Sequence, residues 1–157
     1  MSNVLFNELP RPTFRWLQVN HTEGTVAGGD TAAAVTVSAN EGVVTELFAK
    51  ALLKADFEGA EATSLAAVTN EYTKGLAINV PAGGNEKVII TVDAEGKSVG
   101  DRTRVAIDVA KDAFLEVLYV VKGDAQTGGL NLLTEVKAAE NANVIFKKVQ
   151  LLSEGVQ

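Results

Sequence analysis

The last third of the chain repeats itself, and this repeat restricts the fold more than any other feature of the sequence. When RVAIDVAKDAFLEVLYVV is set above LTEVKAAENANVIFKKVQ, Asp112-Ala113 falls on Asn141-Ala142, an offset of 29 in residue number. Four apolar pairs coincide in that register: Ile107 with Val136, Leu115 with Val144, Val117 with Phe146, and Val120 with Val149. A period of this order is typical of stacked supersecondary units. The repeat therefore predicts successive layers of a solenoid.

The spacing between the two copies contains a polar stretch. The segment KGDAQTGG, Lys122 to Gly129, reads as a loop inside one period. Without it the period shortens to about 21 residues, close to one coil of a β-solenoid. We therefore expect Lys122 to Gly129 to form a loop outside the coil.

A second interpretation of the same stretch is a helix. Asp108, Asp112 and Glu116 are spaced at i, i+4 and i+8, which on a helix places three carboxylates on one face. Such a cluster suits a hard cation or acid–base chemistry. The surrounding VAIDV and FLEVLYVV are rich in β-branched and aromatic residues, which favour strands. On strands and turns the three carboxylates become separate solvent-facing groups, and this is the interpretation that we favour.

The chain before the repeat divides at about residue 75. Residues 1–40 read as extended and rich in turns, and residues 43–75 read as two helices. The first expected helix, VVTELFAKALLKA, places Val44, Leu47, Phe48, Ala51 and Leu52 on one face. The second, TSLAAVTNEYTKG, starts at the capping residue Thr63 or Ser64 and ends at Gly75. From residue 76 the period changes to two in LAINVP, KVIITVDA, RVAIDV and NVIFKKV, which predicts strands. We expect an N-terminal arm and two-helix region over 1–75 and solenoid coils over 76–157.

Composition excludes several classes of function. Hydrophobic residues make up 46% of the 157 residues and charged residues 22%, as in an ordinary globular protein. The net charge of −6, without a clustered basic face, argues against binding nucleic acid or an anionic membrane. The chain has no cysteine, which excludes disulfides, thiolate metal ligands and a cysteine nucleophile. No apolar run of membrane-spanning length and no signal peptide is evident, so we expect a cytoplasmic protein.

Candidate catalytic residues are few. His21 is the only histidine and lies in a turn-like stretch, so a histidine metal cluster is excluded. Gly28-Gly29 and Gly128-Gly129 lack the remaining residues of a phosphate-binding loop and are interpreted as turns. Lys147-Lys148 is a pair of lysines rather than a basic patch. We therefore expect no catalytic, cofactor-binding or metal-binding residues, and no enzyme activity.

Several segments together resemble one family. The opening stretch NELPRPTFRWLQVN, with a Leu-Pro followed by Thr, an aromatic residue, Trp, Leu and Asn, looks like the N-terminal signature of the SufB/SufD family of the SUF iron–sulfur cluster assembly machinery. TKGLAINVPAGGNEKVIITV, residues 73–92, resembles the family's Gly-x-x-Ile-x-Val-Pro-x-Gly segment. The two repeat copies resemble its successive coils, each with an Asp/Asn-Ala corner. The likeness runs from about residue 5 to the end of the chain and is closer to SufD.

The resemblance implies a fold and a role. It implies the start of a right-handed parallel β-helix after a small helical N-terminal region, with strands over Arg104 to Val121. It also implies a non-catalytic scaffold subunit that works with SufB-like and SufC-like partners. The aromatic arm with Phe14 and Trp16 would be a strap over the helical region, although a peptide docking on a partner is the alternative.

The sequence also departs from the family, whose members are about twice as long. The chain stops at Gln157, in the middle of the implied solenoid, and no position matches the Cys and His residues implicated in cluster assembly. The resemblance therefore implies that this chain by itself holds no cofactor and binds neither a cluster nor the SufC ATPase, although the parent complex handles an iron–sulfur cluster.

Two other classes of function stay open. One is a stand-alone β-solenoid interaction module without a cluster-assembly role. The other is a solenoid enzyme, for which the sequence offers only Asp108, Asp112 and Glu116. In either case the last strand, Val144 to Leu152, would expose an unpaired edge, from which we expect self-association.

Overall fold

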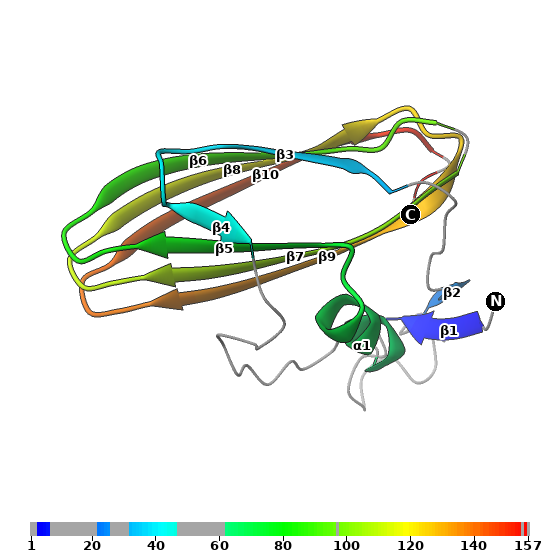
Figure 1. The fold of residues 1–157 in the computed structure, drawn as a ribbon. Helices are drawn as coiled ribbons and strands as arrows, with labels where there is room; N and C mark the ends of the chain where they lie inside the picture. Colours follow the sequence, from blue (N-terminus) through cyan, green and yellow to red (C-terminus); the bar gives the residue numbers. More distant parts are fainter. Residues whose placement is uncertain are drawn as a thin grey trace.

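The computed structural model describes residues 3–6, 22–25, 32–46, 62–96, 98–154 and 156. This part of the chain is mainly β (Figure 1). Its elements in chain order are β1 (Asn3–Phe6), β2 (Thr22–Thr25), β3 (Ala34–Ser38), β4 (Val44–Glu46), α1 (Ala62–Asn70), β5 (Lys74–Val80), β6 (Asn85–Asp93), β7 (Ser98–Val109), β8 (Phe114–Gly123), β9 (Thr127–Ala138) and β10 (Asn143–Leu152).

Two four-stranded mixed sheets face each other. One has the strand order β10-β8-β6-β3 and the other β4-β5-β7-β9, while β1 and β2 form a separate antiparallel pair. From β5 onward each strand lies in the opposite sheet from the one before it, so the chain passes back and forth between two layers (Figure 1). Neighbouring strands from β5 to β10 are parallel, and β3 and β4 join antiparallel at one end of each sheet. Two consecutive strands, one in each layer, make one coil.

The coils stack in a constant register. Lys74 pairs with Thr103, and Asn85 pairs with Phe114, which pairs in turn with Asn143, so equivalent residues are 29 apart, as Asp112 and Asn141 also are. All four apolar pairs predicted from the repeat are Cα partners: Ile107 with Val136, Leu115 with Val144, Val117 with Phe146, and Val120 with Val149. The offset and the strands expected from residue 76 onward are confirmed.

The predicted loop from Lys122 to Gly129 is wrong. Lys122 and Gly123 end β8, and β9 begins at Thr127, so only a short corner lies between the two strands. The preceding coil has the same layout, because Asp93 pairs with Lys122 and Ser98 pairs with Thr127. One coil therefore takes up the whole repeat period without an insertion, and the polar residues form an ordinary corner between long strands.

The core lies between the two sheets. Alternate residues of β5 to β8 point into this space and are almost fully buried, because successive side chains of a strand point to opposite faces. The largest of them are Ile78, Val80, Val88, Ile90, Val92, Val105, Ile107, Val109, Leu115, Val117, Tyr119 and Val121. Burying each apolar side chain of this size contributes about 1.5–3 kcal/mol, so the core is the main source of stability.

One corner of every coil needs the left-handed backbone conformation. Gly83, Asp112 and Asn141 occupy equivalent positions in successive coils, with φ of 69°, 56° and 57°. Gly reaches this region without a steric cost, and Asp and Asn are the other residues that tolerate it best. The Asp/Asn-Ala corner of the sequence repeat is therefore a backbone requirement of the turn.

The helical region differs from the expectation. Val44–Glu46 is a strand, because it pairs antiparallel with Leu76–Ile78 of β5, and the first predicted helix is wrong there. Leu47, Phe48, Ala51 and Leu52 lie outside the described residues. The second helix exists as α1 but begins at Ala62 and ends at Asn70. Gly75 belongs to β5, where pairing with Arg104 extends the strand past the predicted helix end.

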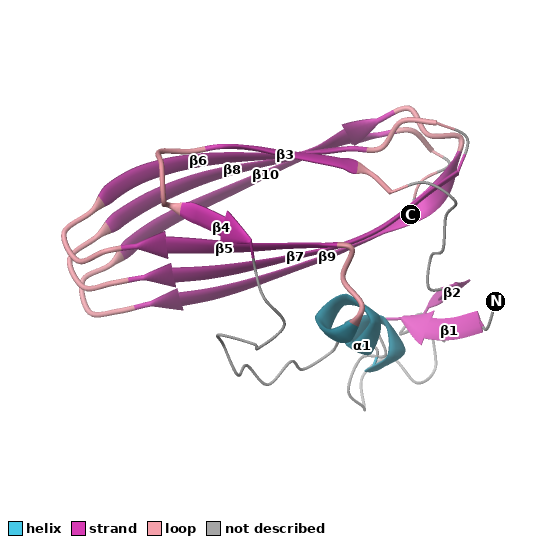
Figure 2. Cartoon of the chain, viewed as in Figure 1, coloured by secondary structure: helices cyan, strands magenta, loops and turns pink. Residues whose placement is uncertain are grey.

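Helix α1 lies against the outer face of the β4-β5-β7-β9 sheet, where it contacts β7 and β9 (Figure 2). Val68 of the helix is buried. No helix in the described part of the chain has the length and apolar character needed to cross a bilayer.

Candidate functional site

Charged side chains on the outer faces pair from one coil to the next. The ion pairs between equivalent residues, 29 apart, are Lys87–Glu116 at 3.7 Å, Asp93–Lys122 at 2.5 Å, Asp108–Lys137 at 2.9 Å and Lys111–Glu140 at 2.9 Å. The hydrogen bond and the charge of Asp93 raise the pKa of Lys122. The parallel register stacks opposite charges in columns, as cross-strand pairing on one face allows.

The three carboxylates singled out in the sequence do not form one site. Asp108 lies in β7, Asp112 in the following corner and Glu116 in β8, so the helical interpretation is wrong. Asp108 pairs with Lys137, and Asp112 accepts a hydrogen bond from Nδ2 of Asn141 at 3.0 Å. Each carboxylate is thus held by the next coil, and the described residues contain no group of three side chains suited to a metal ion.

Glu116 is the carboxylate with two cationic neighbours. Its Oε1 lies 2.7 Å from Nζ of Lys147, and its Oε2 lies 3.7 Å from Nζ of Lys87. The hydrogen bond from Lys147 and the charges of both lysines lower the pKa of Glu116. The carboxylate is therefore an acceptor that links three successive coils, and it has no proton to give at neutral pH.

A polar cluster interrupts the apolar interior. Asp101 is buried and accepts hydrogen bonds from the hydroxyl groups of Thr73 at 2.6 Å and Thr103 at 2.5 Å. Burial and the charge of Asp101 raise the pKa of Tyr119, whose hydroxyl group makes no hydrogen bond. The phenol of Tyr119 therefore stays protonated at neutral pH and lies buried between the sheets.

A buried ion pair joins helix α1 to the sheet. Nε and Nη2 of Arg104 both lie close to Oε2 of Glu135, at 2.9 and 2.8 Å, and Nη1 of Arg104 donates to the carbonyl of Thr69 at 3.1 Å. The two charged side chains are only 4% and 2% exposed. This contact ties β7, β9 and the end of α1 together.

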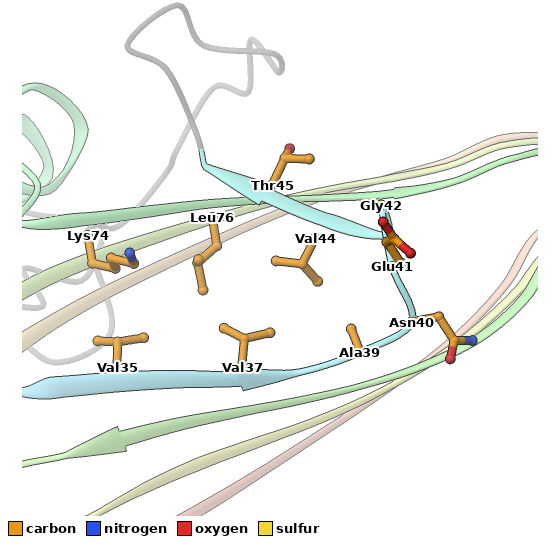
Figure 3. Close-up of a pocket in the computed structure, with 10 residues that line it drawn as sticks. All are labelled: Val35, Val37, Ala39, Asn40, Glu41, Gly42, Val44, Thr45, Lys74 and Leu76. Atoms are coloured by element: carbon orange, nitrogen blue, oxygen red, sulfur yellow. The ribbon is translucent and has the colours of Figure 1, made fainter.

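A slot opens at the β3–β4 end of the sheets. Its volume is about 430 Å³. Figure 3 shows Val35 and Val37 of β3 pointing toward Val44 and Leu76 of the opposite sheet. Lys74 lies at one end of the slot and Glu41 at the other, so the slot is an open margin of the core with a charge at each end.

The opposite end of the sheets is formed by β9 and β10. In the described chain β10 pairs only with β8, and β9 pairs with β7 apart from a single bridge between Gly128 and Val156. Most of the large exposed apolar side chains lie on these two strands: Val136, Ile145, Phe146, Val149 and Leu151. We call the backbone edge of Asn143–Leu152 that faces away from β8 the β10 edge.

A small opening between the sheets lies at this end. It has a volume of about 140 Å³ and is lined by Val121, Leu130, Leu132, Lys148, Gln150 and Leu152. Lys148 is thus an inward-facing residue, and it makes no ion pair with the residues that the structure describes. The β10 edge with Lys148 is the best candidate for a functional contact.

The remaining sequence candidates are placed as follows. Gly128 and Gly129 lie within β9 rather than in a turn, and Lys147 and Lys148 lie on β10. A Cβ on Gly128 would lie 2.0 Å from the carbonyl oxygen of Val99, so close packing between coils explains this glycine. His21, Gly28, Gly29, Phe14 and Trp16 lie outside the described residues.

Sequence reasoning missed two features. The first is the Arg104–Glu135 pair, whose residues are 31 apart and sit diagonally across the repeat register. The second is the inward direction of Lys148, which the register reveals because Lys148 pairs with the buried Tyr119.

No protein-family model matches this chain, and neither the curated proteins nor the solved structures include a significant match.

Proposed function

We propose that this chain is a non-catalytic scaffold subunit of the SufB/SufD kind, SufD-like, and forms the N-terminal part of such a subunit. The observation that carries the proposal is the stack of parallel coils in a constant register. These coils are formed by the segments that resemble the family. The Val-Pro-x-Gly segment supports it, because Val80 ends β5 and Gly83 occupies the left-handed corner.

The proposed fold is the beginning of a right-handed parallel β-helix. Two parallel neighbours such as β5 and β7 are connected through β6 in the opposite sheet. Connections between parallel strands of one sheet are right-handed in about 98% of cases. In this proposal β3 and β4 close the first coil, and further coils would continue on β9 and β10.

The scaffold role follows from the kind of surface that the coils present. The outer faces carry paired charges, and the long strands offer an extended contact area to partner subunits. The proposal places the protein in the cytoplasm together with SufB-like and SufC-like subunits, and the iron–sulfur cluster is cargo of that complex.

A stand-alone β-solenoid interaction module is the second candidate. The exposed apolar side chains of β9 and β10 favour it, since exposed apolar surface commonly marks an interaction site. In this alternative the contact at the β10 edge, rather than cluster assembly, is the function.

The test is to tag the native protein at its N-terminus and to purify it by this tag from cells grown with limited iron. We expect a SufC-type ATPase and a SufB-like subunit to be recovered in stoichiometric amounts, and the intact mass to exceed the 16.5 kDa of this chain. A control uses the same tag on an unrelated cytoplasmic protein. Recovery of the polypeptide without any ATPase would refute the scaffold proposal and leave the interaction module.

A further inference from the structure

The two sheets differ in what lies on their outer faces. Helix α1 contacts β7 and β9 on the outer face of one sheet. Over the outer face of the β10-β8-β6-β3 sheet, the described part of the chain places no helix or strand (Figure 2). Further coils stacked on β10 would lie beside this face rather than over it. Its exposure is therefore not a consequence of the open end of the coils.

Apolar side chains occupy much of this outer face. Leu118 and Val120 flank the buried Tyr119 in β8, so they point away from the core. The register places the apolar residues of the neighbouring strands beside them. The outward apolar residues of the three long strands are Ile89, Phe114, Leu118, Val120, Ile145, Val149 and Leu151. The three on β10 are 38%, 39% and 63% exposed, so the face presents apolar surface to its surroundings.

Two rows of opposite charges flank the apolar residues. Near the start of β6 and β8, Lys87 is the Cα partner of Glu116, and their charged groups lie 3.7 Å apart. Near the end of the same strands, Asp93 is the Cα partner of Lys122, and their charged groups lie 2.5 Å apart. Each strand therefore carries opposite charges at its two ends, and the sign on β6 is the reverse of the sign on β8.

This pattern is complementary to itself. The midpoint between the two charged rows lies at Ile90 and Tyr119, which are Cα partners. A two-fold axis in the plane of the face, perpendicular to the strands at this level, reverses the strand direction in a second copy. Glu116 then faces Lys122 of the second copy, and Lys87 faces Asp93 of the second copy. An axis along the strands would instead place each charged row beside the same row, with Glu116 against Glu116. Because like charges in an interface are unfavourable, the charges select the first arrangement.

The apolar residues match in the same arrangement. Leu118 faces Val120 of the second copy in the middle of the interface, and Ile145 faces Leu151 toward one side. Sheets commonly pack face to face in this way, about 10 Å apart. The pairing therefore encloses apolar side chains between two rows of opposite charges.

The size of the face is sufficient for a weak, specific dimer. β6, β8 and β10 have 9, 10 and 10 residues, and β3 has 5. With a rise of about 3.3 Å per residue and a strand spacing of about 4.8 Å, the face covers about 550 Å². Two copies would bury about 1,100 Å², which is at the lower end for a biological interface. We expect a dissociation constant in the micromolar range.

We propose that the outer face of the β10-β8-β6-β3 sheet binds a second copy of this chain, face to face and with the strands antiparallel. The charged rows set the register, and the apolar residues between them supply the contact. The proposal does not depend on the cluster-assembly role, because it rests on the outward residues of β6, β8 and β10 alone.

The first experiment is sedimentation equilibrium of the full chain at micromolar concentrations. We expect a dimer that Leu118→Lys weakens at least about tenfold, because an unpaired charge would be enclosed in the middle of the interface. The matched control is Val136→Lys. Val136 is 48% exposed, but it pairs with the buried Ile107 and therefore faces the open end of the core. This variant should dimerise like the natural sequence, and circular dichroism should show that both variants are folded.

The second experiment tests the register by exchanging charges. Lys122→Glu brings carboxylates together across the interface, and Glu116→Lys brings ammonium groups together, so each variant alone should dimerise at least about tenfold more weakly. An equal mixture of the two variants should restore the dimer, because both contacts then join opposite charges. The controls are Lys137→Glu and Asp108→Lys, which break an ion pair between coils on the other sheet. Each control should dimerise normally by itself.

Three results would overturn the proposal. The first is a chain that stays monomeric throughout the micromolar range. The second is a dimer that Val136→Lys dissociates and Leu118→Lys leaves intact, which would assign the contact to the open end of the coils. The third is a mixture of Lys122→Glu and Glu116→Lys that dimerises no better than either variant alone.

Discussion

The Arg104–Glu135 pair makes a sharp test of how the coils and helix α1 hold together. Glu135→Leu leaves the guanidinium group of Arg104 enclosed, with the carbonyl of Thr69 as its remaining partner among the contacts described above. Removing one partner of a buried ion pair typically costs about 3–5 kcal/mol, because the other charge stays buried without compensation. Since both side chains are at most 4% exposed, water can do little to screen the loss. We expect a decrease of about 3–5 kcal/mol in the free energy of unfolding.

The assay is urea unfolding followed by circular dichroism, with hydrogen exchange of the α1 amides as a local measurement. The double variant Arg104→Met with Glu135→Leu should recover most of the stability, because apolar replacement of a whole buried pair is often neutral. The control is Lys111→Ala, which breaks an ion pair whose side chains are 54% and 71% exposed and should cost about 0–1 kcal/mol. A loss below about 1 kcal/mol in Glu135→Leu, or a double variant less stable than either single one, would refute the reasoning.

Three further predictions concern the coils. Gly123→Ala should destabilise the protein by about 1–3 kcal/mol in urea unfolding, because φ is 142° and the new Cβ would lie 2.1 Å from the carbonyl oxygen of Ala94. The pKa of Glu116 lies below its usual 4.5 in the folded protein. The ionised carboxylate therefore stabilises the fold above pH 4.5, and this contribution is lost as the pH falls through the lower pKa of the folded state. Lys147→Ala should raise the pKa of Glu116 in an NMR titration. Burial raises the pKa of Tyr119 above 10.0, so the free energy of unfolding should be constant up to about pH 10 with respect to this group and fall as the pH rises further. Tyr119→Phe should be neutral or stabilising in urea unfolding, because the hydroxyl group is buried without a partner.

Each of these predictions has either a control variant or an outcome that would contradict it. Gly83→Asn, at a corner with φ of 69° and open space around the new Cβ, should cost far less than Gly123→Ala, because Asn already occupies the equivalent position 141. A pKa of Glu116 that stays unchanged in Lys147→Ala would contradict the assigned cause. A clear loss of stability in Tyr119→Phe would mean that the hydroxyl group has a partner.

The sequence by itself determined the coil register. Ile107 and Val136, or Leu115 and Val144, can be matched by inspection because parallel strands in register stack equivalent residues directly on one another. The alternation of apolar residues also predicted the strands from residue 76 onward, since successive side chains of a strand point to opposite faces. The corner residues Asp112 and Asn141 can also be recognised in the sequence, because the left-handed backbone conformation limits which residue types can occupy the corner.

Only the tertiary structure decided the features that depend on a partner elsewhere in the chain. Val44–Glu46 has a helical pattern but is a strand, because the edge of β5 offers it backbone hydrogen bonds. The polar residues from Lys122 to Gly129 read as a loop, yet the neighbouring coil extends both strands into them. The burial of Arg104 depends on its contacts with Glu135 and the end of α1, and the place of Lys148 at the opening between the sheets depends on how the two sheets face each other. Local pattern specifies conformation and face, whereas burial and pairing are properties of the assembled layers.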